Sequence, residues 1–217
     1  MMYESSYTKG LSGTVLIPGD KSISHRSVII PSITNGTTEV NNILKSEDVF
    51  KTINAFKLLG VKIEEKNNSL LIRGKGLQSL CKPTNKIDLG NSGTTARLLI
   101  GLLSAQNFES FLFGDHSLSN RPMGRIINPL KKMGACIESN NDKLPIIVRG
   151  KKLKGIKYEL DIPSAQVKSG ISLAALFIDD QTEIIEKNIT RNHTEIMLKL
   201  FEANIKIKKI NQNNHIF

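Results

Sequence analysis

Three short stretches place cations and hydroxyls where the sequence predicts the beginnings of helices. They are "DKSISHR", with Lys21, Ser22 and Arg26; "NSGTTAR", with Asn91, Gly93, Thr94 and Arg97; and "SAQVKS", with Ser164, Gln166 and Lys168. Acidic residues normally suit a helix start, because the macrodipole is positive there, so cations cost stability unless an anion binds. Free N–H groups at a helix start also bind anions. The stretches predict a site for a ligand with several negative groups, such as phosphate and carboxylate.

Two more motifs precede a second set of predicted helices, at Arg121-Pro122 and at Thr190-Arg191. Each residue has a simpler interpretation when taken alone. Lys21 could be a solvated lysine, Ser22, Asn91 and Ser164 could be helix caps, and Arg97 and Arg121 could be ordinary ion-pair partners. The occurrence of the same residue types at equivalent positions favours a shared anion site. For His25 we expect a structural or solvent-facing position.

The elements that carry these motifs repeat along the chain. The repeats cover about 18–76, 87–150 and 160–217, and their first helices begin at Ser22, Ser92 and Ser164, which are 70 and 72 positions apart. Their second helices end at Leu59, Met133 and Phe201, which are 74 and 68 positions apart. Two independent markers with similar spacing indicate a true internal repeat.

Each repeat is predicted to contain a strand, a helix, a strand, a helix and a hairpin. Ser46 is a predicted N-cap, Asn192 with Glu195 has the pattern of a capping box, and Gly60 and Gly134 suit helix stops. The hairpins are predicted to turn at "KNNS", "NNDK" and "NQNN". Right-handed crossovers would make three such units one compact α/β domain (α+β in strict usage), with sheets outside and first helices inside.

Composition limits the class of protein. The chain has 217 residues, a net charge of +10, 39% hydrophobic and 5% aromatic residues, and two cysteines. No apolar run approaches the roughly 18 residues of a membrane span, and the first residues lack a signal-peptide pattern. Spread charges and few aromatics disfavour nucleic acid. We therefore expect a cytoplasmic protein whose partners are small anions, with neither membrane nor nucleic acid among them.

Five motifs together resemble the 3-phosphoshikimate 1-carboxyvinyltransferases, or EPSP synthases. These are "PGDKSISHR", "LGNSGTTARLL", "NRPMGR", "SAQVKS" and "RNHTE". The last two are similar to the branch called class II. The resemblance implies three βαβαββ repeats that form one inside-out barrel-like domain of the enolpyruvyl transferase fold. It also implies a transfer of the enolpyruvyl group of phosphoenolpyruvate to the 5-hydroxyl of 3-phosphoshikimate, with release of phosphate, in the shikimate pathway to chorismate and aromatic amino acids.

The resemblance also implies roles for individual residues. Lys21 would contact both substrates and act in catalysis. The 3-phosphoshikimate site would use Lys21, Ser22, Arg26, Ser164, Gln166 and Thr190. The phosphoenolpyruvate site would use Lys21, Gly93, Arg121 and Gln166. Weaker candidates are Asn91, Thr94, Arg97, Lys168 and Arg191. No metal or organic cofactor is expected. Thr190 stands where relatives commonly have Ser, and Ala165 where some have Ser.

Length is the main departure from the family. Its complete chains have a second, similarly built domain, and the third hairpin here stops at "NHIF". We therefore expect the N-terminal half alone, truncated in its last repeat and inactive by itself, with a separately encoded second domain as one partner. Residues 18–217 would form the domain, and residues 1–17 would be a strand segment that belongs with the second domain.

Alternatives remain open at this point. A non-catalytic remnant that binds shikimate phosphate fits the same motifs. The enolpyruvyl transferases that act on UDP-N-acetylglucosamine have Lys-Asn where this chain has Lys21-Ser22, and a Cys in the loop matching "GDHSLSNRP", where this chain has none. RNA 3′-phosphate cyclases share the architecture but not the motifs.

Overall fold

The computed structural model describes residues 3–4, 6–10, 12–66 and 69–217. The first repeat is built from five elements, namely α1 (Lys21–Ser32), β1 (Asn35–Val40), α2 (Glu47–Leu58), β2 (Lys62–Lys66) and β3 (Ser69–Lys75). The second is built from seven, namely β4 (Ile87–Asp88), α3 (Gly93–Ser104), β5 (Glu109–Phe113), α4 (His116–Ser119), α5 (Gly124–Lys132), β6 (Cys136–Asn140) and β7 (Lys143–Arg149). The third is built from β8 (Lys157–Glu159), α6 (Ala165–Ala175), β9 (Glu183–Glu186), α7 (His193–Leu200), β10 (Ile207–Ile210) and β11 (Asn213–Ile216).

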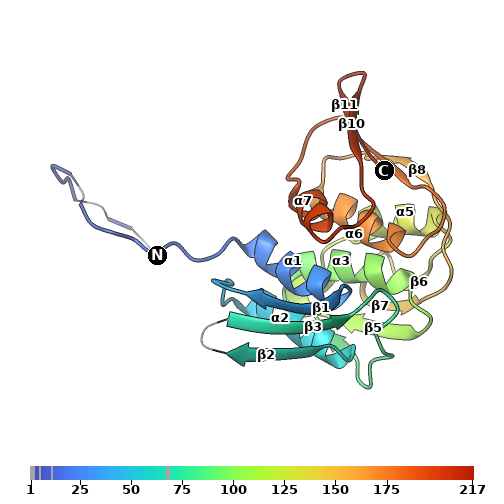
Figure 1. Ribbon diagram of the computed structural model, residues 1–217, viewed down its shortest axis with the longest axis horizontal. Helices are drawn as coiled ribbons and strands as arrows, with labels where there is room; N and C mark the ends of the chain where they lie inside the picture. The colour runs from blue at the N-terminus through green and yellow to red at the C-terminus, as the bar shows by residue number, and fades with distance from the viewer. Residues whose placement is uncertain (1–2, 5, 11, 67–68) are drawn as a thin grey trace.

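Each repeat has its own sheet, and the three sheets follow one plan. Their strand orders are β1-β3-β2, β4-β5-β7-β6 and β8-β9-β11-β10. In the second and third sheets a leading strand pairs in parallel, β4 with β5 and β8 with β9, and all other pairs are antiparallel. The threefold repeat is confirmed. The sheets stay separate and do not close into a barrel, so the barrel-like prediction holds only as a ring of sheets around helices (Figure 1).

The first sheet has no leading strand within the described residues. Residues 12–20 form neither helix nor strand, and the N-terminal arm extends away from the body of the protein (Figure 1). Val15, Leu16 and Ile17 are 77%, 92% and 74% exposed. The assignment of residues 1–17 to a second domain stays a prediction.

Local sequence explains the helix ends, with two corrections. Asp20, not Ser22, caps α1, because its Oδ1 accepts the N–H of Ile23 at 2.8 Å. The caps Asp20, Ser92 and Ser164 are therefore evenly spaced, 72 positions apart. The capping box predicted at Asn192 is wrong, because Asn192 makes no side-chain cap bond and Glu195 pairs elsewhere.

The predicted turns and helix stops are confirmed where the structure describes them. Gly60 and Gly134 have φ of 88° and 96°, in the left-handed region that suits glycine. The "NNDK" and "NQNN" turns have left-handed residues, at Asn141 and Asp142 and at Asn211 and Gln212. The centre of "KNNS" lies outside the described residues.

The core is aliphatic, and the first helices form its centre. Most of α3 is buried, and it packs along α6 at a glycine contact. A Cβ built on Gly101 would lie 2.1 Å from the carbonyl oxygen of Gly170. This close approach brings α3 and α6 side by side, beside α1 (Figure 1). No described helix is long and apolar enough to cross a membrane.

Candidate anion-binding site

The structure brings residues of four of the five predicted motifs to one place. A small hollow of about 10 Å³ is lined by residues from the starts of α1, α3, α6 and α7 and from the loop before α7, namely Ser22, Arg26, Thr94, Ala165, Gln166, Arg191 and His193. These residues come from all three repeats. The packing of the first helices therefore brings together stretches in which the sequence predicts an anion site.

A chain of hydrogen bonds joins α3 to α6 at the hollow. One Arg97 Nη1 donates to the side-chain oxygen of Gln166 at 3.0 Å and to the carbonyl of Gly93 at 3.1 Å. The Gln166 amide donates to the Thr94 hydroxyl at 3.0 Å. Arg97 and Gln166 thereby fix each other's orientation before any ligand arrives, which is the preorganisation that a binding site needs.

Gly93 lies between two guanidinium groups. A Cβ at this position would be 2.9 Å from Nη1 of Arg97 and 3.4 Å from Nη1 of Arg121. The exposed Arg121 donates to the side-chain oxygen of Asn91 and, at 3.3 Å, to the hydroxyl of Ser117. The start of α3 therefore combines a bare backbone with two converging cations, as phosphate binding requires.

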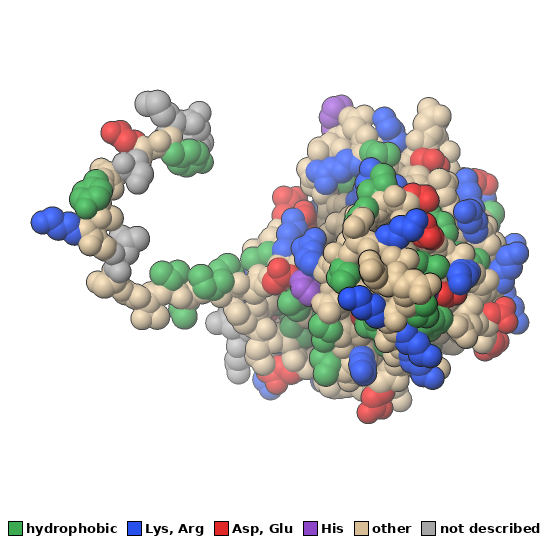
Figure 2. Space-filling view, turned by 90° about the horizontal axis from the view of Figure 1, so that it is seen from above, with side chains coloured by type: hydrophobic (Ala, Val, Ile, Leu, Met, Phe, Trp, Pro, Cys, Tyr) green, Lys and Arg blue, Asp and Glu red, His purple; other side chains and the backbone are tan. Residues whose placement is uncertain are grey.

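The cations at this end are short of negative partners. Burial, together with Arg121 and Arg125, lowers the pKa of Arg97. Among the described residues, no carboxylate lies within ion-pair distance of Arg97, Arg121 or Arg191. Figure 2 shows Lys and Arg side chains beside the base of the N-terminal arm, with a few Asp and Glu side chains next to them. An anion bound here would relieve repulsion among fixed positive charges.

Lys21 has a carboxylate neighbour that the sequence did not reveal as part of the site. Its Nζ forms an ion pair with Oδ2 of Asp48, on the first turn of α2. Lys21 remains 52% exposed, whereas Asp48 is 19% exposed. Asp48 suited the role of a helix-start acid, so local pattern gave no reason to connect it with Lys21. The pair puts a proton donor and a proton acceptor side by side at the edge of the site.

Arg26 is buried and satisfied by protein groups. Its guanidinium donates to the Thr194 hydroxyl, to the Ser169 hydroxyl at 2.7 Å and to the Ser22 carbonyl at 2.9 Å. Burial lowers the pKa of Arg26 to about 10, opposed by the charge of Glu195. Arg191 reaches the same place from outside, because its Nη1 donates to the Ser22 hydroxyl at 3.0 Å. Arg26 therefore links α1 to α6 and α7, while Arg191 lies exposed at the mouth.

Lys168 does not face the hollow. This corrects the expectation that Lys168, like Arg191, is a weaker candidate for contact with the substrates. It is fully buried, and its ammonium contacts Glu186 at 3.0 and 3.1 Å and Glu195 at 2.7 Å. Glu186 also accepts the backbone N–H of Thr190 at 2.8 Å and the Thr190 hydroxyl. This buried cluster holds the loop that carries Thr190 and Arg191. Glu186 is not among the residues predicted from sequence, and its one signal there is its place at the end of a strand.

Hydrogen bonds between hydroxyls and His25 connect α1, α2 and α3 beneath the site. His25 Nδ1 contacts the Thr52 hydroxyl at 2.7 Å, Thr52 contacts Thr95 at 2.7 Å, and Thr95 contacts Ser92 at 2.6 Å. Burial lowers the pKa of His25 to about 4, so it is neutral at physiological pH. Of the two positions expected for His25, structural or solvent-facing, the structural one is found.

The remaining predicted residue, Ser164, caps α6 by accepting the N–H of Val167 at 3.3 Å. In the part of the chain that the structure describes, no three His, Cys, Asp or Glu side chains are grouped to hold a metal ion. The arrangement can bind an anion with two or more charged groups and can move a proton at Lys21.

Comparisons with known proteins point in the same direction. A sequence model of the family described as EPSP synthase (3-phosphoshikimate 1-carboxyvinyltransferase) matches residues 6–216. The chain is 53% identical over 203 residues to the 3-phosphoshikimate 1-carboxyvinyltransferase of Ruthia magnifica subsp. Calyptogena magnifica, covering 93% of this chain and 47% of the relative. It is 50% identical to the protein of the same name from Oceanobacillus iheyensis, and the match covers 90% of this chain and 46% of that relative.

A solved structure agrees at the level of the fold. EPSP synthase from Acinetobacter baumannii superimposes with a TM-score of 0.87 at 45% sequence identity, covering 94% of this chain and 46% of that one. The chain thus spans about half the length of the relatives that it matches.

Proposed function

The chain belongs to the EPSP synthase family, and from that premise we propose that its anion site binds 3-phosphoshikimate and phosphoenolpyruvate for enolpyruvyl transfer. The observation that carries the proposal is the hollow lined jointly by Ser22, Thr94, Gln166 and Arg191, which joins the predicted motifs of all three repeats. Two phosphorylated acids would supply the negative charge that this group of cations lacks.

The proposed reaction balances without a cofactor. The 5-hydroxyl oxygen of 3-phosphoshikimate bonds to C2 of phosphoenolpyruvate as C3 gains a proton and the hydroxyl loses one. The tetrahedral adduct then expels phosphate and loses a proton from C3, which restores the double bond. Lys21 is the proposed proton carrier, because its exposed ammonium is paired with Asp48 and lies next to Ser22.

The proposed substrate contacts follow the geometry of the site. Arg121, Gly93 and Gln166 would hold the phosphate of phosphoenolpyruvate, supported by Asn91 and Arg97. Ser22, Ser164, Gln166 and Thr190 would hold 3-phosphoshikimate, with Arg191 at the mouth. Arg26, buried as it is, would reach the ligand only if one of its present hydrogen bonds were exchanged.

Titration calorimetry with 3-phosphoshikimate tests the binding site. We expect binding that weakens as salt is added, because the contacts are charged and partly exposed. Arg191→Ala should weaken binding, while Lys187→Ala, a basic residue paired with Glu159 on the surface, should not. Equal affinities of the two variants, or no heat at millimolar ligand, would remove Arg191 and its neighbours from the site.

A second candidate function is binding of 3-phosphoshikimate without chemistry. It is favoured by one observation: both carboxylates of the five motifs are engaged, Asp20 as the cap of α1 and Glu195 with the buried Lys168. Asp48, outside the motifs, is already paired with Lys21. We propose that turnover requires a second polypeptide, which supplies the base for the hydroxyl proton. The assay measures phosphate release by this chain, alone and mixed with a separately expressed second half of a relative, the half that this chain does not match. Turnover by the chain alone that Lys21→Met abolishes would overturn this requirement.

A cytoplasmic location is part of the same proposal. It is supported by the two cysteines, Cys81 and Cys136, which are both free.

A further inference from the structure

A buried ion cluster lies beneath the part of the anion site that the third repeat supplies. Lys168 on α6 pairs with Glu186, the last residue of β9, and with Glu195 on α7. Each of the three side chains is at most 2% exposed. Charges removed from water are costly, so the cluster needs a reason beyond the general packing of the domain.

The fold itself does not require the cluster, because the other two repeats do without it. The lysine lies four positions after the cap of α6, and the residues at the same distance from the caps of α1 and α3 are Ser24 and Ala96. The strands equivalent to β9 are β1 and β5, which end in Val40 and Phe113 rather than in a carboxylate. Apolar residues are often as stabilising as a buried ion pair. A special task in the third repeat therefore accounts for the cluster better than stability alone.

The two glutamates of the cluster differ in what they hold. Oε1 of Glu186 accepts the backbone N–H of Thr190 at 2.8 Å and the Thr190 hydroxyl, and both oxygens of Glu186 contact the Lys168 ammonium, at 3.0 and 3.1 Å. Glu195 contacts the same ammonium through Oε1 at 2.7 Å, and its Oε2 has no hydrogen-bond partner among the described residues. Of the two, Glu186 therefore connects the buried cluster to the loop before α7.

Thr190 is the inward-facing anchor of that loop. Residues 187–192 join β9 to α7 and form neither helix nor strand, and among them Thr190 is half-buried while the others are exposed. The next residue, Arg191, lines the hollow and donates from Nη1 to the Ser22 hydroxyl at 3.0 Å. Because two hydrogen bonds to a buried carboxylate fix Thr190, they also limit where the Arg191 side chain can begin.

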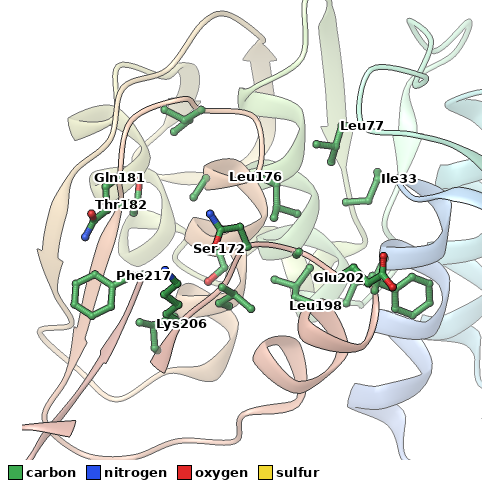
Figure 3. Close-up of a pocket in the computed structure, with 18 of the residues that line it drawn as sticks. Ile33, Leu77, Ser172, Leu176, Gln181, Thr182, Leu198, Glu202, Lys206 and Phe217 are labelled. Atoms are coloured by element: carbon green, nitrogen blue, oxygen red, sulfur yellow. The ribbon is translucent and has the colours of Figure 1, made fainter. Parts of the chain in front are cut away.

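The same helix and strand also border a second, larger cavity. It has a volume of about 720 Å³ and is lined by Ser172 and Leu176 at the end of α6 and by Thr182 just before β9 (Figure 3). The hydroxyl of Ser172 is buried and has no hydrogen-bond partner in the part of the chain that the structure describes. Ser172 lies one turn beyond Lys168 and lines this cavity rather than the hollow. A substitution at Ser172 therefore shows whether any change in α6 disturbs the anion site.

We propose that Glu186 is a positioning residue for the binding of 3-phosphoshikimate, and that it acts through Thr190 on Arg191. The inference rests on the proposed function, because it takes 3-phosphoshikimate as the ligand of the hollow. Lys168 holds the Glu186 carboxylate in place and that carboxylate holds the loop, so the Arg191 guanidinium is already at the mouth when the ligand arrives. The start of α3, where the phosphate of phosphoenolpyruvate is proposed to bind, belongs to the second repeat, so phosphoenolpyruvate binding should depend much less on Glu186.

The test is calorimetry on the full chain with a matched pair of variants. Glu186→Met and Glu195→Met each leave Lys168 with one carboxylate, but only Glu186→Met removes the acceptor of the Thr190 N–H and hydroxyl. We expect Glu186→Met to weaken 3-phosphoshikimate binding roughly tenfold or more, and phosphoenolpyruvate binding less than about threefold. Glu195→Met and Ser172→Ala should weaken 3-phosphoshikimate binding less than about threefold. Equal losses in the two Met variants, or equal losses for the two ligands, would overturn the proposal, because a role in folding alone would affect them alike.

Hydrogen exchange tests the anchor without a ligand. The Thr190 amide should exchange slowly in the wild type and in Glu195→Met but fast in Glu186→Met, and fast exchange in the wild type would overturn the proposal. If Glu186→Met does not fold, Glu186→Asp replaces it, because its carboxylate can still pair with Lys168 but is one methylene too short to hold Thr190. Equal affinity of the wild type and the Glu186 variant for 3-phosphoshikimate would overturn this inference alone, whereas no binding by the wild type would overturn the proposed function as well.

Discussion

Arg26 and Lys168 are buried beside the same helix starts at which Lys21, Arg121 and Arg191 lie exposed. Each of these two buried residues has protein partners of its own. Arg26 donates to two hydroxyls and a carbonyl, and Lys168 pairs with two glutamates. The exposed set has fewer partners, and of its members Lys21 alone has a carboxylate close by among the described residues.

Desolvation explains why the buried cations have more protein partners than the exposed ones. A buried charge without partners costs several kcal/mol, so Lys168 must be paired for the domain to fold. An exposed cation is hydrated and can exchange water for a ligand. Basic residues that look alike in the sequence therefore divide into those that hold the site together and those that meet the anion.

Lys168→Met should lower the free energy of unfolding by about 3–5 kcal/mol, because it leaves Glu186 and Glu195 buried without a cation. Urea denaturation measures the change. Lys187→Met removes an exposed pair with Glu159 and should cost less than about 1 kcal/mol. Similar losses for both variants would mean that the buried cluster contributes no more than a surface ion pair.

Acid should destabilise the domain through His25. Its pKa is about 4 when folded, against an ordinary value of 6.5, so between these pH values the unfolded chain binds the proton more readily. Stability should fall by roughly 3 kcal/mol as pH drops from 6.5 to 4, and His25 should add nothing further below that. Unfolding of wild type and His25→Asn across this range isolates the contribution. Parallel curves would show that another group controls the slope.

Gly93→Ala should weaken phosphoenolpyruvate binding about tenfold, or about 1.4 kcal/mol. The added methyl would lie 2.9 Å from Arg97 and 3.4 Å from Arg121, so both guanidinium groups would have to move. Calorimetry measures the affinity, and 3-phosphoshikimate should be affected less. Unchanged phosphoenolpyruvate affinity would place that phosphate elsewhere.

Arg121→Ala should change the free energy of unfolding by no more than about 0.5 kcal/mol, because this side chain is exposed. The same variant should weaken phosphoenolpyruvate binding. A loss of stability comparable to that of Lys168→Met would contradict the division into structural and ligand-facing cations.

Much of the fold followed from local pattern. The threefold repeat, the turns at Asn141 and Asn211 and the stops at Gly60 and Gly134 depend on backbone preferences that each short segment carries with it. The first cap was misplaced by two residues, because Ser22 and Asp20 are both good cap residues and only the Asp20–Ile23 contact chooses between them.

The repeats, the helix starts and the residue types at those starts could be predicted from sequence, because periodicity and capping act over a few positions. Tertiary packing was needed to decide that Lys168 is buried while Arg191 is exposed, and that Lys21 pairs with Asp48. These outcomes depend on which groups meet across 18 or more positions and on how much water the packing excludes, and a short stretch of sequence determines neither.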